Sequence, residues 1–248
     1  MKRISKTLVA LVLALAATAC GAEEEDDEDE IVALPAGFDP SAAYAPNVSG
    51  ASLSENITNP LFPAPVGAKW RYEAHVDGKT ERVEISVEAG TKAVWGATAR
   101  VVRDTVYVDD ELVEDTWDWY GQDAEGIVWY LGEDTKEYEN GQVKCACGAW
   151  TSGQDGALPG IIMLATPKVG EAYRQEYFKG EAEDVAEVVA IDETVSVPAG
   201  KFSGCIKTRD VSVVDRSVEE FKFYCPGVGL VLDLDGDERT ELVEYSGL

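Results

Sequence analysis

The sequence predicts an all-β fold in which antiparallel meanders, arranged in two similar modules, form one curved sheet, half-barrel or sandwich. From Pro65 onward, apolar and polar residues alternate in short runs that are separated by Gly, Asp and Asn. No window of helical length shows a period of 3.6 residues. Several short sequence motifs also recur in similar form 103 or 104 positions later, which indicates an internal repeat.

Residues 1–19 have the pattern of a secretory signal peptide. Basic residues at positions 2, 3 and 6 precede an apolar run that is shorter than the roughly 20 residues of a membrane-spanning helix. The run ends at Cys20, which resembles the lipobox cysteine of bacterial prolipoproteins, although Ala17 stands where that family usually has Leu, Val or Ile. The alternative is an ordinary signal peptide with a chance cysteine.

The lipobox resemblance implies that the chain is cleaved before Cys20, lipidated on this residue and held on a membrane by its acyl chains. Gly21 beside the cysteine resembles the signal for sorting to the outer membrane. The expected location is therefore the outer membrane, on its periplasmic side or at the cell surface.

Residues 20–64 are predicted to be a lipidated, disordered tether. Eight consecutive acids over 23–30 favour a solvated spacer, and they also resemble the surface-export signals of some bacterial lipoproteins. Six prolines between positions 35 and 65 disfavour regular strand pairing.

The charge balance excludes nucleic acid as a partner. The chain has 21 Lys and Arg against 47 Asp and Glu, for a net charge of −26, and loss of the three basic residues of the signal peptide lowers it to −29. Nucleic acids and anionic lipid surfaces are bound through clustered basic residues.

Residues 65–248 are predicted to form one all-β domain made of two repeats, at about 65–150 and 167–245. Trp70 corresponds to Tyr173, and the Trp-Asp-Trp-Tyr phrase at 117–120 corresponds to Phe-Lys-Phe-Tyr at 221–224. Docking of the halves would cover one exposed edge of each. The expected strands of the first repeat are 70–76, 82–88, 98–108, 112–120, 126–133 and 135–139. The candidate helix is a short turn within 158–166.

Two phrases near the end of the chain resemble uncharacterised bacterial envelope β lipoproteins, some of which are similar to the LolA/LolB-type half-barrel. They are Thr-Val-Ser-Val-Pro-Ala-Gly-Lys-Phe at 194–202 and Tyr-Cys-Pro-Gly-Val-Gly-Leu-Val at 224–231. The resemblance covers about the last third of the chain, and its motifs mark turns and no site residues.

Four cysteines follow Cys20, an even number that indicates disulfides in an oxidising compartment. Cys205 and Cys225 are equidistant from the predicted turn of a hairpin near Asp215, so we expect them to pair. Cys145 and Cys147 allow a tight Cys-x-Cys disulfide or a copper(I) site.

The acidic stretch near the C-terminus has two interpretations. Its residues Asp233, Asp235, Asp237 and Glu241 resemble the calcium loop of FG-GAP repeats, with Glu238 and Glu241 as departures from that pattern. The Asp-Gly dipeptide at 235–236 favours an ordinary hairpin turn instead. No cofactor is expected unless this stretch binds calcium.

Aromatic residues gather in the first repeat, where alternation places Trp117 and Trp119 on one face of their strand. With Trp129 and Tyr130 they are candidates for lining a cavity that holds an apolar molecule or a sugar. The alternative is that all four fill the core.

The function expected from the sequence is non-catalytic binding of an apolar envelope molecule by a membrane-anchored lipoprotein. The chain has one histidine and no Gly-x-Ser-x-Gly motif or phosphate loop. The alternatives are a calcium-stabilised structural or adhesive surface module and a hydrolase that uses two carboxylates.

Overall fold

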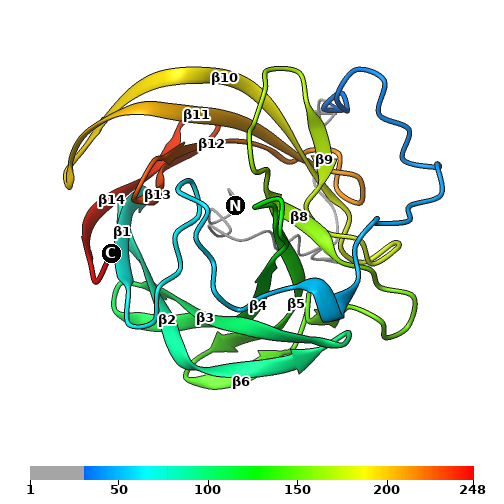
Figure 1. Ribbon diagram of the computed structural model, residues 1–248. Coiled ribbons are helices and arrows are strands. Elements are labelled where there is room, and N and C mark those ends of the chain that lie inside the picture. Colours follow the sequence, from blue (N-terminus) through cyan, green and yellow to red (C-terminus); the bar gives the residue numbers. More distant parts are fainter. Residues whose placement is uncertain (1–30, 77) are drawn as a thin grey trace, which may run out of the picture.

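The computed structural model describes residues 31–76 and 78–248, in which antiparallel β-strands are the main secondary structure (Figure 1). Cys20 and the acidic block at 23–30 lie outside the described residues. The strands of the first half are β1 (Lys69–Val76), β2 (Lys79–Val94), β3 (Ala97–Val108), β4 (Glu111–Gln122), β5 (Val128–Glu139) and β6 (Gln142–Cys145). Those of the second half are β9 (Ala172–Arg174), β10 (Asp184–Val197), β11 (Gly200–Ser212), β12 (Glu219–Cys225), β13 (Gly229–Asp235) and β14 (Glu238–Ser246).

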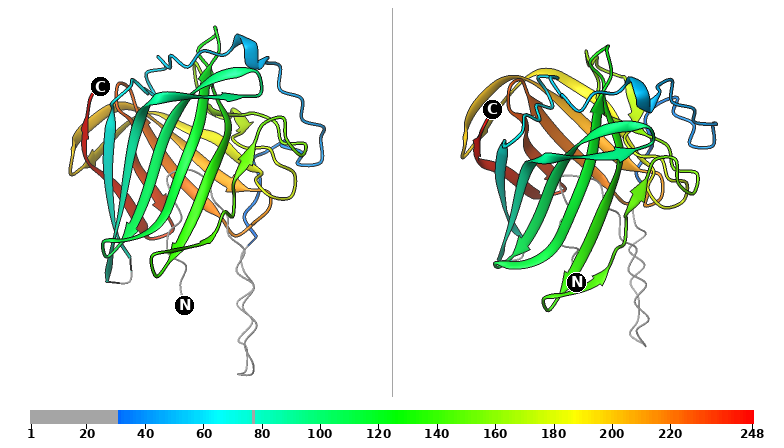
Figure 2. Two further views of the ribbon diagram at one scale, coloured as in Figure 1. Left: turned by 90° about the horizontal axis from the view of Figure 1, so that it is seen from below. Right: turned by 60° about the horizontal axis from the view of Figure 1, so that its bottom comes forward.

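All strands belong to one curved sheet that is not closed into a barrel. Its order is β6-β5-β4-β3-β2-β1-β14-β13-β12-β11-β10-β9, so the first strand of the chain lies beside the last. The short strands β7 (Trp150–Thr151) and β8 (Gly160–Met163) both pair with β5. Figure 2 shows the strands of the first half lying across the interior from those of the second. The predicted all-β fold in one curved sheet is confirmed.

The strand plan agrees with the internal repeat. Each half contains six strands, and strands that are consecutive in the chain are neighbours in the sheet. Along the sheet, the first half is ordered from its sixth strand, β6, to its first, β1. The second half follows in the same direction, from its sixth strand, β14, to its first, β9. The β1–β14 pairing, with Lys69 opposite Ser246, joins the halves and covers one edge of each, as expected.

Two of the expected elements differ from the structure. The runs at 126–133 and 135–139 form the single strand β5, in which Gly132 has a φ of +126°. A Cβ at this glycine would lie 2.3 Å from the carbonyl oxygen of Trp150, because β7 packs directly against it. The predicted helix within 158–166 is wrong, since pairing with β5 makes residues 160–163 the strand β8.

Residues 53–64, which we name the entering segment, belong to the folded domain. The prolines here do prevent strand formation, and the described helix in this region is the 3-10 turn η1 (Gly50–Ser52). Ile57, Leu61 and Ala64 are nevertheless buried in the main core, and Leu53 is buried in the smaller cluster with residues of β3, β4 and β5. The segment passes into the interior of the curved sheet (Figure 1). This finding corrects the predicted tether, whose disorder cannot extend over residues 53–64.

Hydrogen bonds hold the entering segment in place. The buried side chain of Asn59 donates to the carbonyl oxygens of Gly126, at 2.9 Å, and Leu164, at 3.0 Å. The side chain of Gln122 on β4 accepts hydrogen bonds from the backbone of Thr58, at 2.7 Å, and of Asn59, at 2.9 Å. The segment therefore acts as a fixed part of the interior.

The buried apolar residues form three clusters, of which the smallest contains Tyr173, Ala186 and Val188. The main core lies on the concave inner face, with Tyr72, Val83, Tyr120 and Leu242 among its most buried members. A smaller cluster lies on the outer face of β3, β4 and β5. No helix in the described part of the chain is long and apolar enough to cross a membrane.

Candidate functional site

A cavity of about 70 Å³ lies in the interior, between the inner face of the sheet and the entering segment. Both halves of the chain line it, and nearly all of its wall is apolar. The lining residues are Phe62, Pro63, Ala64, Trp70, Tyr72, Ile85, Val87, Val102, Asp104, Asp118, Tyr120, Ile162, Tyr224, Val228, Gly229 and Leu230.

Two hydrogen bonds across the interior fix the cavity wall. The indole nitrogen of Trp70 donates to the carbonyl oxygen of Val228, at 2.8 Å, and the hydroxyl of Tyr72 donates to that of Leu230, at 3.0 Å. Both donors come from β1; the acceptor Leu230 is in β13, and the acceptor Val228 immediately precedes this strand. The cavity is therefore built into the junction between the two halves.

Two acids, Asp104 and Asp118, interrupt the apolar wall. Asp104 lies between Val102 and Val106 in the alternation of β3, which turns its side chain inward with theirs. Asp118 on β4 is opposite Val102, so the two acids are diagonal neighbours on the inner face. Asp104 is 1% exposed and Asp118 is fully buried.

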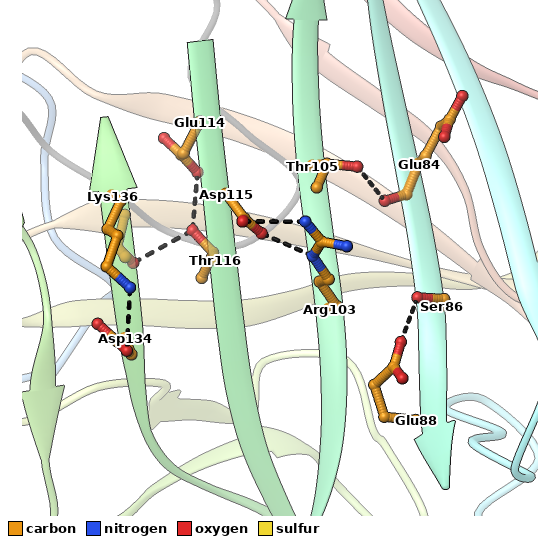
Figure 3. Close-up of polar contacts among 11 residues, drawn as sticks. Glu84, Ser86, Glu88, Arg103, Thr105, Glu114, Asp115, Thr116, Asp134 and Lys136 are labelled. Atoms are coloured by element: carbon orange, nitrogen blue, oxygen red, sulfur yellow. Dashed lines mark hydrogen bonds and ion pairs between the residues drawn. The ribbon is translucent and has the colours of Figure 1, made fainter. Parts of the chain in front are cut away.

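The basic neighbour of Asp104 in the sequence does not compensate its charge. Arg103 points to the outer face, where its guanidinium donates two hydrogen bonds to Asp115, at 2.7 and 3.0 Å (Figure 3). Neither oxygen of Asp104 has a hydrogen-bond partner among the described residues. Burial therefore raises the pKa of Asp104 well above its ordinary value, and the carboxyls of Asp118 and Glu114 raise it further.

A tyrosine joins Asp118 to the next carboxyl along the inner face. The hydroxyl of Tyr130 lies 2.6 Å from Asp118 Oδ1 and 2.7 Å from Glu133 Oε2. One hydroxyl donates one proton, so the second short contact requires a protonated carboxyl that donates to the tyrosine oxygen. Burial raises the pKa of both acids, which favours this shared proton.

Three further acids of the first half turn inward with Asp104 and Asp118. We name this group the inner carboxyl cluster; its members are Glu81, Asp104, Glu114, Asp118 and Glu133. Glu114 accepts a hydrogen bond from the hydroxyl of Thr116, at 3.2 Å (Figure 3). Burial, reinforced by the charges of Glu238 and Glu114, raises the pKa of Glu81 to about 8.

The second half has inner acids as well, but these surround a lysine. The ammonium of Lys222 lies 2.8 Å from Glu220 Oε2 and 3.2 Å from Asp210 Oδ2. Asp210 also accepts a hydrogen bond from the side chain of Gln175, at 3.1 Å. Burial lowers the pKa of Lys222, but Glu220 and Asp210 outweigh that effect and raise it overall, so the lysine is charged.

The structure does not bring the four predicted aromatic residues together. Trp117 and Trp119 do share one face of β4, but it is the outer face, where they contact Arg103 and Lys92 respectively. Trp129 belongs to the same outer cluster. Only Tyr130 points inward, to the inner carboxyl cluster, so the four do not line a single cavity.

The predicted calcium ligands lie on a hairpin. Asp235 pairs with Glu238 across the turn from β13 to β14, as the alternative interpretation expects. Asp233 is buried on β13, and Asp237 is in the turn. In the described ranges, no group of three or more His, Cys, Asp or Glu is arranged to hold a metal ion. The set formed by Asp233, Asp235, Asp237 and Glu241 is therefore not assembled as a calcium loop.

Both predicted disulfides are present. Cys205 and Cys225 face each other across β11 and β12, with their Cα atoms 4.1 Å apart. Cys145 is bonded to Cys147, which answers the choice between disulfide and copper(I) in favour of the disulfide.

Sequence reasoning missed Asp104 and Asp118 because acids are abundant in this chain. A signal was available, since both lie in phase with inward apolar residues of a half-buried strand: Asp104 with Val102 and Val106, and Asp118 with Tyr120. An acid at an inward-facing position of a strand is rare unless it is paired with another group or has a function.

Comparisons with known proteins add little. No family model matches the chain, and no curated protein matches it. Among solved structures, the chain is similar to a candidate lipoprotein from Parabacteroides distasonis, with a TM-score of 0.39 and 14% identity over 75% of this chain and 98% of the other. A likeness at this level is too weak to assign a family or a function.

Proposed function

We propose that this protein is a bacterial envelope lipoprotein, anchored through Cys20 in the outer membrane, which binds a small molecule inside its curved sheet without catalysing a reaction. The observation that supports the binding role is the cavity between the two halves and the entering segment. Its apolar wall suits an apolar group, and two buried acids give it polar atoms that orient a ligand.

The position of the cavity also supports this proposal. Residues from β1 and β13 meet there, and the hydrogen bonds of Trp70 and Tyr72 hold the wall in place before any ligand arrives. Little conformational entropy is then lost on binding, because the site is already ordered.

The binding role is tested with n-butanol as an apolar probe that carries one hydroxyl. We expect titration of the full-length protein to shift the NMR signals of Tyr72, Val102 and Leu230. Val102→Ile places one more methyl group in the cavity and is expected to weaken binding. Val101→Ile is the matched control, because it places the additional methyl group in the outer cluster, on the opposite face of β3.

Equal effects of the two substitutions, or NMR shifts confined to residues of the outer face, would overturn the binding role.

The anchor is tested separately, by labelling growing cells with a fatty acid and fractionating their membranes. We expect Cys20→Ser to abolish the label and release the protein from the outer membrane, while Cys147→Ser leaves both unchanged. An unlabelled Cys20 in the parent protein would contradict the anchor.

A further inference from the structure

The cavity contains two acids whose hydrogen-bonding capacity the fold does not use. Both oxygens of Asp104 and Oδ2 of Asp118 lack a hydrogen-bond partner among the described residues. Asp104 is 1% exposed and both side chains line the cavity. Native proteins leave few buried polar atoms unsatisfied, so two neighbouring acids in this state call for an explanation.

No basic side chain in the described ranges is placed to neutralise these acids. Arg103, the nearest in sequence, is bound to Asp115 on the outer face. The strongest charges that act on Asp104 come from other carboxyls, namely Asp118, Glu114, Glu81 and Asp115. The pair therefore lies among other carboxyl groups and apolar walls, where a cation would find acceptors and no competing basic side chain from the described part of the chain.

The second half shows how the same architecture accommodates a positive charge. Lys222 stands 104 positions after Asp118, and both are buried on the inner face of the fourth strand of their repeat. Tyr120 and Tyr224, two positions further on, correspond in the same way and both line the cavity. In the second half the chain supplies an ammonium group to its acids, whereas in the first half an acid occupies the equivalent position.

Resting on the binding role proposed above, we propose that the ligand is an organic primary ammonium ion with a short apolar body. Its ammonium group would donate hydrogen bonds to Asp104 and to Oδ2 of Asp118, as Lys222 does to Glu220 and Asp210. An ammonium has three donors and a carboxylate only accepts, so the two groups are complementary. The apolar body would contact Tyr72, Val102 and Leu230.

Binding of this ion is coupled to proton release. Without a ligand, burial and the neighbouring carboxyls raise the pKa of Asp104 well above its ordinary value and so favour its protonated form. When the ammonium arrives, the O–H bond of the carboxyl breaks, its proton passes to the buffer and the carboxylate pairs with the ammonium, which stays charged. The titratable groups that interact with Asp104 from the inner faces of the surrounding strands are Tyr72, Glu81, Glu114, Asp118 and Tyr120.

The test compares n-butylamine with n-butanol, which has nearly the same size and shape but no charge. Isothermal titration calorimetry of the full-length protein near neutral pH, in two buffers with different ionisation enthalpies, gives both the affinity and the number of protons released. We expect n-butylamine to bind about tenfold more tightly or better. Proton release is expected with the amine alone.

Asp104→Asn is expected to reduce the affinity for n-butylamine to that for n-butanol and to abolish proton release. An asparagine has the shape of the protonated acid, so the variant should fold, and Asp118→Asn provides a second route to the same result. Asp115→Asn is the matched control on the outer face of β4, and we expect it to leave both affinities unchanged.

Two further outcomes separate this inference from the function on which it rests. Equal binding of n-butylamine and n-butanol would overturn the ammonium preference and leave the binding role intact. Binding of neither probe would overturn the binding role itself. Calcium chloride and potassium chloride are titrated alone as well. If either salt produced the same heat and proton release as n-butylamine, the acids would bind inorganic cations, and the inference would be overturned.

Discussion

The ammonium of Lys222 lies 2.8 Å from the carboxylate of Glu220; the side chain of Lys222 is 4% exposed and that of Glu220 is 12% exposed. Lys222→Met should leave Glu220 and Asp210 buried without their counterion. Breaking a buried ion pair in this way costs about 3–5 kcal/mol. Urea denaturation measures the loss, and Lys201→Met on the exposed surface of β11 is the control, with an expected change below about 0.5 kcal/mol. Equal losses in the two variants would show that the ion pair does not stabilise the fold.

Stability should fall as the pH rises from about 5 to about 8. Burial raises the pKa of Glu81 from 4.5 to about 8 and that of Asp184 from 3.8 to about 6. The folded state therefore binds more protons than the unfolded state between these values. Each unit of raised pKa contributes about 1.4 kcal/mol that is present at low pH and lost as the pH passes through the folded value.

Thermal unfolding followed by circular dichroism at several pH values measures this dependence. Glu81→Gln should flatten the curve, because the amide does not titrate. Glu84→Gln, on the exposed face of the same strand, should leave the slope unchanged. A melting temperature that rises toward pH 8 would contradict the raised pKa values.

The two disulfides should differ in their effect on stability. The Cys205–Cys225 bond spans 20 positions, so its loss should cost about 3 kcal/mol through the greater chain entropy of the unfolded state. The Cys145–Cys147 bond spans two positions and restricts the unfolded chain far less. Denaturation of the two double Cys→Ser variants tests this, and a larger loss at Cys145 and Cys147 would refute it.

Asn59→Ala should loosen the entering segment. The substitution removes two hydrogen bonds to buried carbonyl oxygens and one that Asn59 accepts from the backbone of Leu61. We expect a loss of about 2–3 kcal/mol in stability. Hydrogen exchange of the amides at 57–62 should accelerate as well. Asn56→Ala, at an exposed position of the same segment, is the control, and equal exchange in both variants would contradict the anchoring role of Asn59.

Much of the sheet could be predicted from alternation alone. Apolar residues at every second position indicate one buried face of a strand. Examples are Trp70, Tyr72 and Ala74 in β1 and Val83, Ile85 and Val87 in β2. The partner of Cys205 was also predictable, because a hairpin places residues at equal distances from its turn opposite each other.

The interior could not be predicted in the same way. Proline content rules out strand pairing for residues 53–64, but it does not determine whether Ile57 and Leu61 find a buried surface. The acids presented a similar difficulty, since Asp104 and Asp115 have the same chemistry and differ only in the face of the sheet to which they point. That difference depends on register across four strands, which is tertiary information.

The pairing of β1 with β14 has a consequence for biosynthesis. Arg71 and its partner Glu244 are 173 positions apart, so β1 emerges from the ribosome long before the strand that will cover it. Until then, the outer edge of the first half offers unpaired backbone groups to any other chain nearby. The growing chain therefore needs its first half protected until β14 is made, and truncation of the last nine residues would leave that edge permanently open.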